Sequence, residues 1–167
     1  MTDIPTVLAG PDVTGRGRSL NPFVVVDGAA GLITFCEEVF GAREVPEART
    51  ATPAGSLIHA EVRLGDSFLL LADRQDGWQA RPGLLQVWVS SVDDVLARAV
   101  ERGGQVVTPP SPFYGELTLA RMADPWGNLW WLYASAPGQA DPAPHWAGGS
   151  DVVFRTLDEH LRTPAAP

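Results

Sequence analysis

The chain repeats one pattern of secondary structure about sixty residues apart. Two hairpin-like segments, Gly55–Leu71 and Gly115–Tyr133, each follow a strand-like run and a helix-like run. A unit repeated at this period cannot bury its own apolar face and needs a partner. Because only two copies are present, we expect a closed pair of half-sheets with a ligand site at their seam. The preceding runs are Val24–Val26 and Ala29–Phe40 for the first hairpin, and Val87–Val89 and Val92–Arg102 for the second.

The composition limits the classes of partner. A net charge of −8 argues against nucleic acid or an anionic membrane, since both require a basic surface. All twelve basic residues are arginine, so no lysine is present for Schiff-base chemistry. Cys36 is the only cysteine, which excludes an intrachain disulfide and a cysteine-based metal cluster. With no signal-like or membrane-length apolar segment, we expect a cytoplasmic protein.

The pattern predicts three regions along the chain. Residues 1–19 form an arm rich in Gly, Pro, Thr and Asp. Residues 20–134 form the repeated domain, with module one at 20–73 and module two at 83–134. Residues 137–167 form a linker and a short helix.

That last helix is expected at Asp151–Leu161, with Ser150 as a possible N-cap. Its apolar stripe of Val153, Leu157 and Leu161 must pack on something. The helix could cover its own sheet, contact a second subunit, or lie over the mouth of a cavity.

Three connecting segments carry more local expectations. Arg43–Pro53 has a mixed composition and is predicted to be a linker. Pro109–Pro112 is predicted to be a proline-rich loop after a strand that begins at Gln105. A dense cluster of turn residues, Asp124–Asn128, is expected to turn the second hairpin.

Several motifs in this order resemble the vicinal oxygen chelate superfamily. They are the helix end Phe35–Ala42, the strand His59–Glu61, the loop Tyr114–Glu116 and the turn that opens Asp124–Trp130. The likeness is greatest to the PhnB-like, glyoxalase/bleomycin-resistance branch. It spans residues 20–134 and implies an α+β fold of two βαβββ modules, whose strands form a curved, incomplete barrel around a cleft.

Metal enzymes of this superfamily hold a divalent ion with His, Gln or Glu from four strands. The resemblance places the corresponding positions near Asn21, Leu70, Leu84 and Trp131. Leucine and tryptophan side chains cannot coordinate a metal, and asparagine alone binds weakly. We therefore expect no metal and no cofactor, and no direct inheritance of glyoxalase or dioxygenase activity.

Strand alternation predicts which residues face the cleft. If Gly65 and Asp66 form a two-residue turn, Arg63 pairs with Phe68, while Ile58 points to the opposite face, under the helices. Tyr114 and Glu116 are expected at the cleft rim. The predicted ligand-binding residues are Asn21, Phe23, Arg63, Phe68, Leu70, Leu84, Gln86, Trp88, Tyr114, Glu116, Trp131 and Tyr133.

His59 and Glu61 are the candidates for catalysis. His59 is the only histidine in the two modules, and Glu61 lies one step away on the same face. The carboxylate could orient the ring of a general base. Alternatively, the two residues make structural hydrogen bonds, with Arg63 or at a dimer seam. A new metal site would require a third ligand that the sequence does not offer.

The tryptophans also permit two interpretations. Trp88 and Trp131 could stack on a flat ligand, as in drug-sequestering members of the superfamily. They could instead fill the volume that a metal and its waters would occupy, which would close the cleft. Trp126 and Trp130 are expected outside the sheet or at a subunit contact.

Four hypotheses follow. The first is a homodimer that binds an apolar or aromatic small molecule without a metal, as a resistance or sequestration protein. The second is an isomerase, cyclase or lyase of the same fold with His59 as general base, acting on a carbonyl substrate. A metal-dependent glyoxalase or dioxygenase is disfavoured. A purely structural dimer with a collapsed cleft is the fourth.

Overall fold

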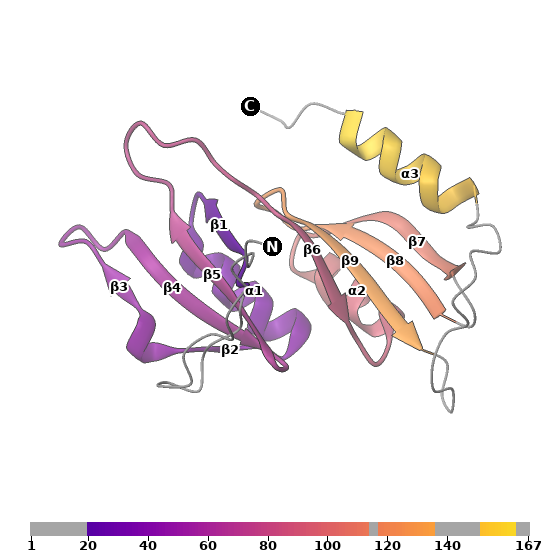
Figure 1. The fold of residues 1–167 in the computed structure, drawn as a ribbon, viewed down its shortest axis with the longest axis horizontal. Helices are drawn as coiled ribbons and strands as arrows, with labels where there is room; N and C mark the ends of the chain where they lie inside the picture. The colour runs from indigo at the N-terminus through magenta and orange to yellow at the C-terminus, as the bar shows by residue number, and fades with distance from the viewer. Residues whose placement is uncertain (1–19, 114–116, 136–150, 163–167) are drawn as a thin grey trace, which may run out of the picture. The chain divides into compact units, whose positions relative to one another are not determined.

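The computed structural model describes residues 20–113, 117–135 and 151–162. The chain divides into two units, the first formed mainly by residues up to Arg81 and the second mainly by residues from Pro82 onward. Each unit contains one sheet (Figure 1). The predicted Tyr114 and Glu116, the arm at 1–19 and the linker at 137–150 lie outside the described residues.

The elements follow the predicted order in both units. The first unit contains β1 (Phe23–Val26), α1 (Ala29–Phe40), β2 (Arg43–Glu44), a 3₁₀ turn (Pro46–Ala48), β3 (Thr50–Ala51), β4 (Leu57–Leu64) and β5 (Ser67–Asp73). The second contains β6 (Leu84–Trp88), α2 (Val92–Glu101), β7 (Gln105–Phe113), β8 (Leu117–Ala123), β9 (Leu129–Ser135) and α3 (Asp151–Arg162).

The two sheets have the same topology. The strand order is β1-β5-β4-β2 in the first, with β3 also paired to β4, and β6-β9-β8-β7 in the second. In each, the first strand runs parallel to the last strand of the hairpin, β1 beside β5 and β6 beside β9. The predicted α+β fold with a repeated βαβββ unit is therefore confirmed.

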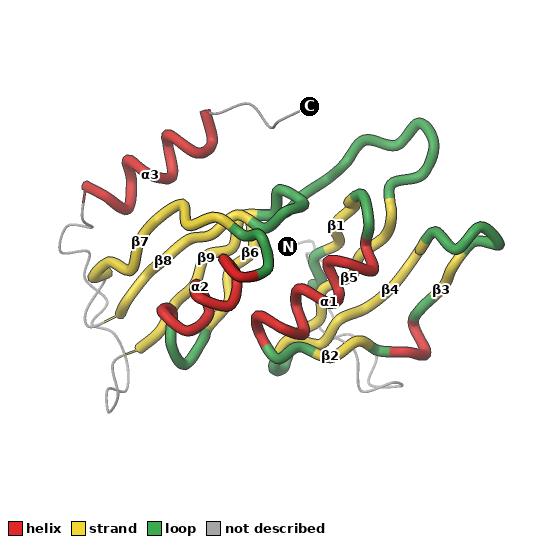
Figure 2. Tube along the Cα trace, turned by 180° about the vertical axis from the view of Figure 1, so that it is seen from behind, coloured by secondary structure: helices red, strands yellow, loops and turns green. Residues whose placement is uncertain are grey.

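One helix covers one face of each sheet (Figure 2). α1 buries Leu32, Cys36 and Val39, which recur at helical spacing, and ends at Gly41 in the left-handed conformation, as expected. α2 starts with Ser91, whose hydroxyl accepts a hydrogen bond from the Asp94 amide. The opposite face of each sheet is the one on which the predicted cleft residues lie.

A buried carboxylate organises the turn between β8 and β9. Asp124 Oδ1 accepts hydrogen bonds from the amides of Trp126 and Asn128, and Oδ2 accepts from Asn128 Nδ2 and the Trp130 indole. Gly127 supplies the positive φ of 85° that the turn requires. Burial raises the pKa of Asp124, and these four hydrogen bonds oppose the shift.

Trp130 corrects a sequence-based expectation. It is not available for a subunit contact, because only 1% of its surface is exposed and its ring packs against Phe40 of α1. Its indole N–H needs a buried acceptor, and Asp124 provides one at 2.9 Å. The alternation of β9 places Trp130 on the face opposite its neighbour Trp131.

Asp73 has a comparable role in the first unit. Its Oδ1 accepts from the amides of Gly28 and Ala29 at the start of α1, and its Oδ2 accepts from the Leu57 amide at the start of β4. The carboxylate thus satisfies helix N–H groups that have no partner within the helix.

Two expected loops are wrong. The segment 109–112 continues β7, and the region 43–53 contains β2, the 3₁₀ turn and β3. β7 tolerates its prolines because it is the edge strand of its sheet and is irregular on both sides of Thr108. Short paired strands lie below the length at which an alternating pattern can be recognised.

Ile58 is also misplaced by simple alternation, since 43% of its side chain is exposed. β3 pairs Thr50 with His59 and Ala51 with Leu57, which leaves Ile58 as the extra residue of a bulge. A bulge redirects the side chain that it carries.

None of the described helices has the length and apolar character needed to cross a membrane.

We predict that Asp124→Asn lowers the free energy of unfolding by about 2–4 kcal/mol. The new NH₂ group meets two N–H donors and can accept from neither, which leaves buried polar groups unpaired. Urea denaturation monitored by circular dichroism measures the change. Asp76→Asn, at an exposed position, is the matched control. Equal stability of the two variants would show that the hydrogen bonds to the Asp124 carboxylate do not contribute to the free energy of unfolding.

Candidate functional site

The face of the first sheet opposite α1 has the predicted register, and Phe68 on it is buried. Arg63 pairs with Phe68, and Leu64 with Ser67, so Gly65 and Asp66 form the expected two-residue turn. Leu70 lies between Glu61 on β4 and Phe23 on β1. Phe23, Glu61, Phe68 and Leu70 therefore share one face. Asn21 precedes β1 and is half-buried.

His59 and Glu61 contact each other on this face. His59 Nε2 lies 3.2 Å from Glu61 Oε1, and both side chains are partly buried. The imidazole also lies near Phe23, with ring centroids 6.0 Å apart. This geometry suits a carboxylate that orients a histidine ring. Arg63 is directed elsewhere, since its Nε donates to the Gly65 carbonyl oxygen in the turn.

The corresponding face of the second sheet carries an aromatic cluster. The ring of Tyr133 lies 5.5 Å from Trp88, 5.8 Å from Phe113 and 6.5 Å from Trp131, measured between centroids. β6 is the outer strand here, and 59% of Trp88 is exposed. Gln86, opposite Trp131, and Leu84 are also exposed. The face thus presents the accessible indole of Trp88 beside the packed rings of Tyr133, Phe113 and Trp131.

Arg121 belongs to this face and was missed in the sequence. Its register partner on β9 is Trp131, and its guanidinium carbon lies 3.9 Å from the Trp131 ring centroid. Only 1% of Arg121 is exposed. The signal was available, because a turn at Asp124–Asn128 pairs these two residues. Arg121 was not expected on this face, because arginine side chains are rarely fully buried.

The environment of Arg121 is unusual for a charged group. Its NH1 donates to Thr108 Oγ1 at 3.1 Å and to the carbonyl oxygen of Val153 in α3 at 2.6 Å. Among the described residues, no carboxylate pairs with it and its Nε has no hydrogen-bond partner. Burial lowers the pKa of Arg121, while the nearby Tyr133 opposes the change.

α3 packs on this face of its own unit. Val153 is buried against Leu119 and Tyr133, with Phe113 and Trp131 packed around them. Thr156 adds a hydrogen bond to Thr108 at 2.6 Å. Of the three options for the terminal helix, the structure therefore selects its own sheet, on the face that carries predicted ligand-binding residues.

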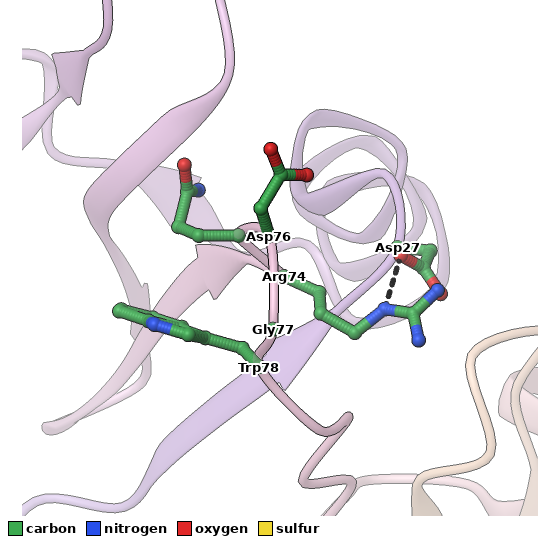
Figure 3. Close-up of a pocket in the computed structure, with 6 residues that line it drawn as sticks. Asp27, Arg74, Asp76, Gly77 and Trp78 are labelled. Carbon is green, nitrogen blue, oxygen red and sulfur yellow. Dashed lines mark hydrogen bonds and ion pairs between the residues drawn. The ribbon is translucent and has the colours of Figure 1, made fainter.

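A polar depression of about 370 Å³ lies in the first unit and is lined by none of the candidate residues (Figure 3). Its lining includes Asp27, Arg74, Asp76 and Trp78, and an exposed Arg74–Asp27 ion pair of 2.9 Å crosses it. Exposed ion pairs of this kind contribute little. Its open, polar walls offer no enclosed binding surface, so we do not assign the site there.

Comparison with known proteins identifies the family. Residues 19–132 match the model of the glyoxalase/bleomycin resistance protein/dioxygenase superfamily. The chain belongs to this superfamily. Its members generally bind small-molecule ligands or substrates. An uncharacterized protein of Mycobacterium bovis is 32% identical over 126 residues, which covers 68% of this chain and 81% of the relative.

Solved structures of the superfamily share the fold. A PhnB protein from Bacillus cereus aligns with a TM-score of 0.54 at 16% identity, covering 70% of this chain and 98% of that one. A fosfomycin resistance protein from Listeria monocytogenes aligns with a TM-score of 0.55 at 15% identity, covering 71% and 93%. Both likenesses concern the fold alone.

The resemblance matches the metal-holding positions of superfamily enzymes to residues of this chain that do not suit a metal. Leu70 in the first unit, and Leu84 and Trp131 in the second, have no lone-pair donor to offer. Across the described ranges, no group of three or more His, Cys, Asp or Glu side chains converges as ligands would. The pair of His59 and Glu61 supplies two donors at most.

We predict that the purified chain binds Zn²⁺, Ni²⁺ or Mn²⁺ only weakly. Elemental analysis after dialysis should find well under one equivalent, and added metal should not raise the melting temperature. His59→Ala serves as a comparison, because it removes the one histidine on the candidate faces. One tightly bound equivalent in the original chain, lost in this variant, would contradict the proposed donor assignment.

Proposed function

We propose that the protein binds an apolar or aromatic small molecule without a metal, in a resistance or sequestration role. The observation that carries this proposal is the aromatic cluster of Trp88, Trp131 and Tyr133 on one sheet face. A pocket for an aromatic compound needs rigid rings and few polar groups. The other predicted ligand-binding residues, a homodimeric state and a cytoplasmic location form part of the same proposal.

The exposure of Trp88 supports an open binding face over a collapsed core. Trp131 is half-buried, while most of the Trp88 surface remains accessible beside Tyr133. A flat ligand that stacks on Trp88 would extend the existing ring cluster and remove this indole from water. Stacking of this kind adds to the free energy gained from burial.

We predict that aromatic compounds quench the tryptophan fluorescence of the chain and that Trp88→Ala weakens their binding about tenfold or more, roughly 1.4 kcal/mol. Titration of a panel of neutral and anionic bicyclic compounds measures the effect. Trp78→Ala removes an exposed tryptophan of the first unit and is the matched control. Binding that is absent, or equally strong in both variants, would remove the basis of the proposal.

A second function is favoured by one specific contact, the 3.2 Å approach of His59 Nε2 to Glu61 Oε1. In this alternative the protein is an isomerase, cyclase or lyase of the same fold. His59 acts as general base toward a carbon acid next to a carbonyl group, and Glu61 orients the ring. No metal takes part in that assignment.

The alternative predicts that His59→Ala abolishes turnover of a carbonyl substrate while its affinity changes little. A base in position contributes about 10²–10⁴-fold to rate. Glu61→Gln should lower the turnover number by less, because it retains a hydrogen-bond acceptor. Ile58→Ala, on the neighbouring bulge, is the control. Turnover that survives His59→Ala would exclude this histidine as the base.

A further inference from the structure

We propose that Arg121 is the anion-binding residue of the aromatic face, that its ligand is a singly charged aromatic carboxylate, and that α3 occupies this position until the ligand displaces it. The inference rests on the proposed small-molecule binding and specifies its ligand class and its control. It is based on two unpaired N–H donors beneath α3, on the charge of the residues around them, and on the few contacts that hold α3 against the sheet.

Two buried donors beneath α3 have no acceptor among the described residues. They are Nε of Arg121 and Nε1 of Trp131, and the two side chains stack on each other. A buried N–H group without a partner is costly, and the cost is higher when it belongs to a charged group. A ligand carboxylate placed beside this pair would supply the missing acceptors and a counter-charge together.

The Val153 carbonyl oxygen stands in for part of such a ligand. It accepts a 2.6 Å hydrogen bond from NH1 of Arg121, with Thr108 as the other partner of that nitrogen. A neutral carbonyl compensates a buried guanidinium less than a carboxylate does, because it carries no full charge. The site is therefore better matched to an anion than to the helix that covers it.

The ligand should carry one negative charge. Arg121 is the only basic residue in the four strands of the second sheet, and both arginines of α3 are paired with acids of the same helix, Arg155 with Glu159 and Arg162 with Asp158. The whole chain carries a net charge of −8, which disfavours multiply charged anions. The Trp131 ring against the guanidinium, and the rings of Tyr133 and Trp88 in the same cluster, favour an aromatic body.

α3 is held by few contacts. Within its twelve residues only Val153 is fully buried, and Phe154 and Leu161 are largely exposed. The i,i+4 ion pairs on its outer surface support the helix without help from the sheet. A helix docked through one fully buried apolar side chain, the half-buried Val152 and Leu157, and two hydrogen bonds can be displaced by a ligand that binds the uncovered face more tightly.

The test compares 2-naphthoate with 2-naphthamide, which has nearly the same shape but no charge. Isothermal titration on the full chain should show the carboxylate binding at least tenfold more tightly. In Arg121→Met this preference should fall to about one, whereas Arg43→Met, at an exposed position of β2, should retain it. Because both probes meet the same α3 in each variant, their affinity ratio reports on the guanidinium alone.

A second arm tests α3 and leaves Arg121 intact. Val153→Ala should tighten 2-naphthoate binding about five- to tenfold, because a weaker dock competes less well. Leu161→Ala, on the same helix but exposed, should leave the affinity unchanged. Hydrogen exchange should also show that 2-naphthoate accelerates exchange of the α3 amides in the original chain.

The outcomes separate this inference from the proposed function. If both probes bind equally and Arg121→Met has no effect on their ratio, the anion site is wrong while the aromatic binder stands. If neither probe binds, both proposals fail. If 2-naphthoate is preferred but Val153→Ala does not tighten it and α3 exchange is unchanged, the displacement of α3 is refuted. A misfolded Arg121→Met leaves the second arm to decide.

Discussion

The convergence of four N–H groups on the Asp124 carboxylate is the interaction on which the second unit depends. It closes the β8–β9 turn, and Asn128 Oδ1 extends the same network to the Gly83 amide, where β6 begins. This network sets the register that pairs Arg121 with Trp131. A slip of one residue would turn every side chain of β8 to the other face. The aromatic face and its buried guanidinium therefore depend on the register that this turn sets.

The same face contains a buried charged group, Arg121, whose hydrogen bonding is incomplete. A guanidinium is buried with partial compensation from Thr108, the Val153 carbonyl and the Trp131 ring, without a carboxylate from the described residues. Elsewhere in the unit, the buried carboxylate of Asp124 is fully supplied with donors. Polar groups left incompletely paired in a fold that is otherwise well satisfied mark places where function has shaped the structure.

The helices and strands with long periodic sequence patterns were predicted more accurately than the short ones. α1 matched its expected bounds because twelve residues gave a clear helical period and Gly41 an unambiguous end. The strand expected from Gln105 ended before Pro109, because proline is excluded from central strands. No local pattern shows that a strand lies at the edge of its sheet. The two-residue turn after Leu64 placed Arg63 and Phe68 correctly, yet the bulge at Ile58 depended on pairing with β3, a strand too short to recognise.

The sequence by itself determined the doubled βαβββ unit and the faces on which Glu61 and Trp131 lie. These follow from local periodicity and from side-chain chemistry, which are written residue by residue. Only the tertiary structure decided that Arg121 is buried and that Val153 of α3 covers it. Both depend on segments distant in sequence, where the free energy of packing, rather than any local preference, selects the partner.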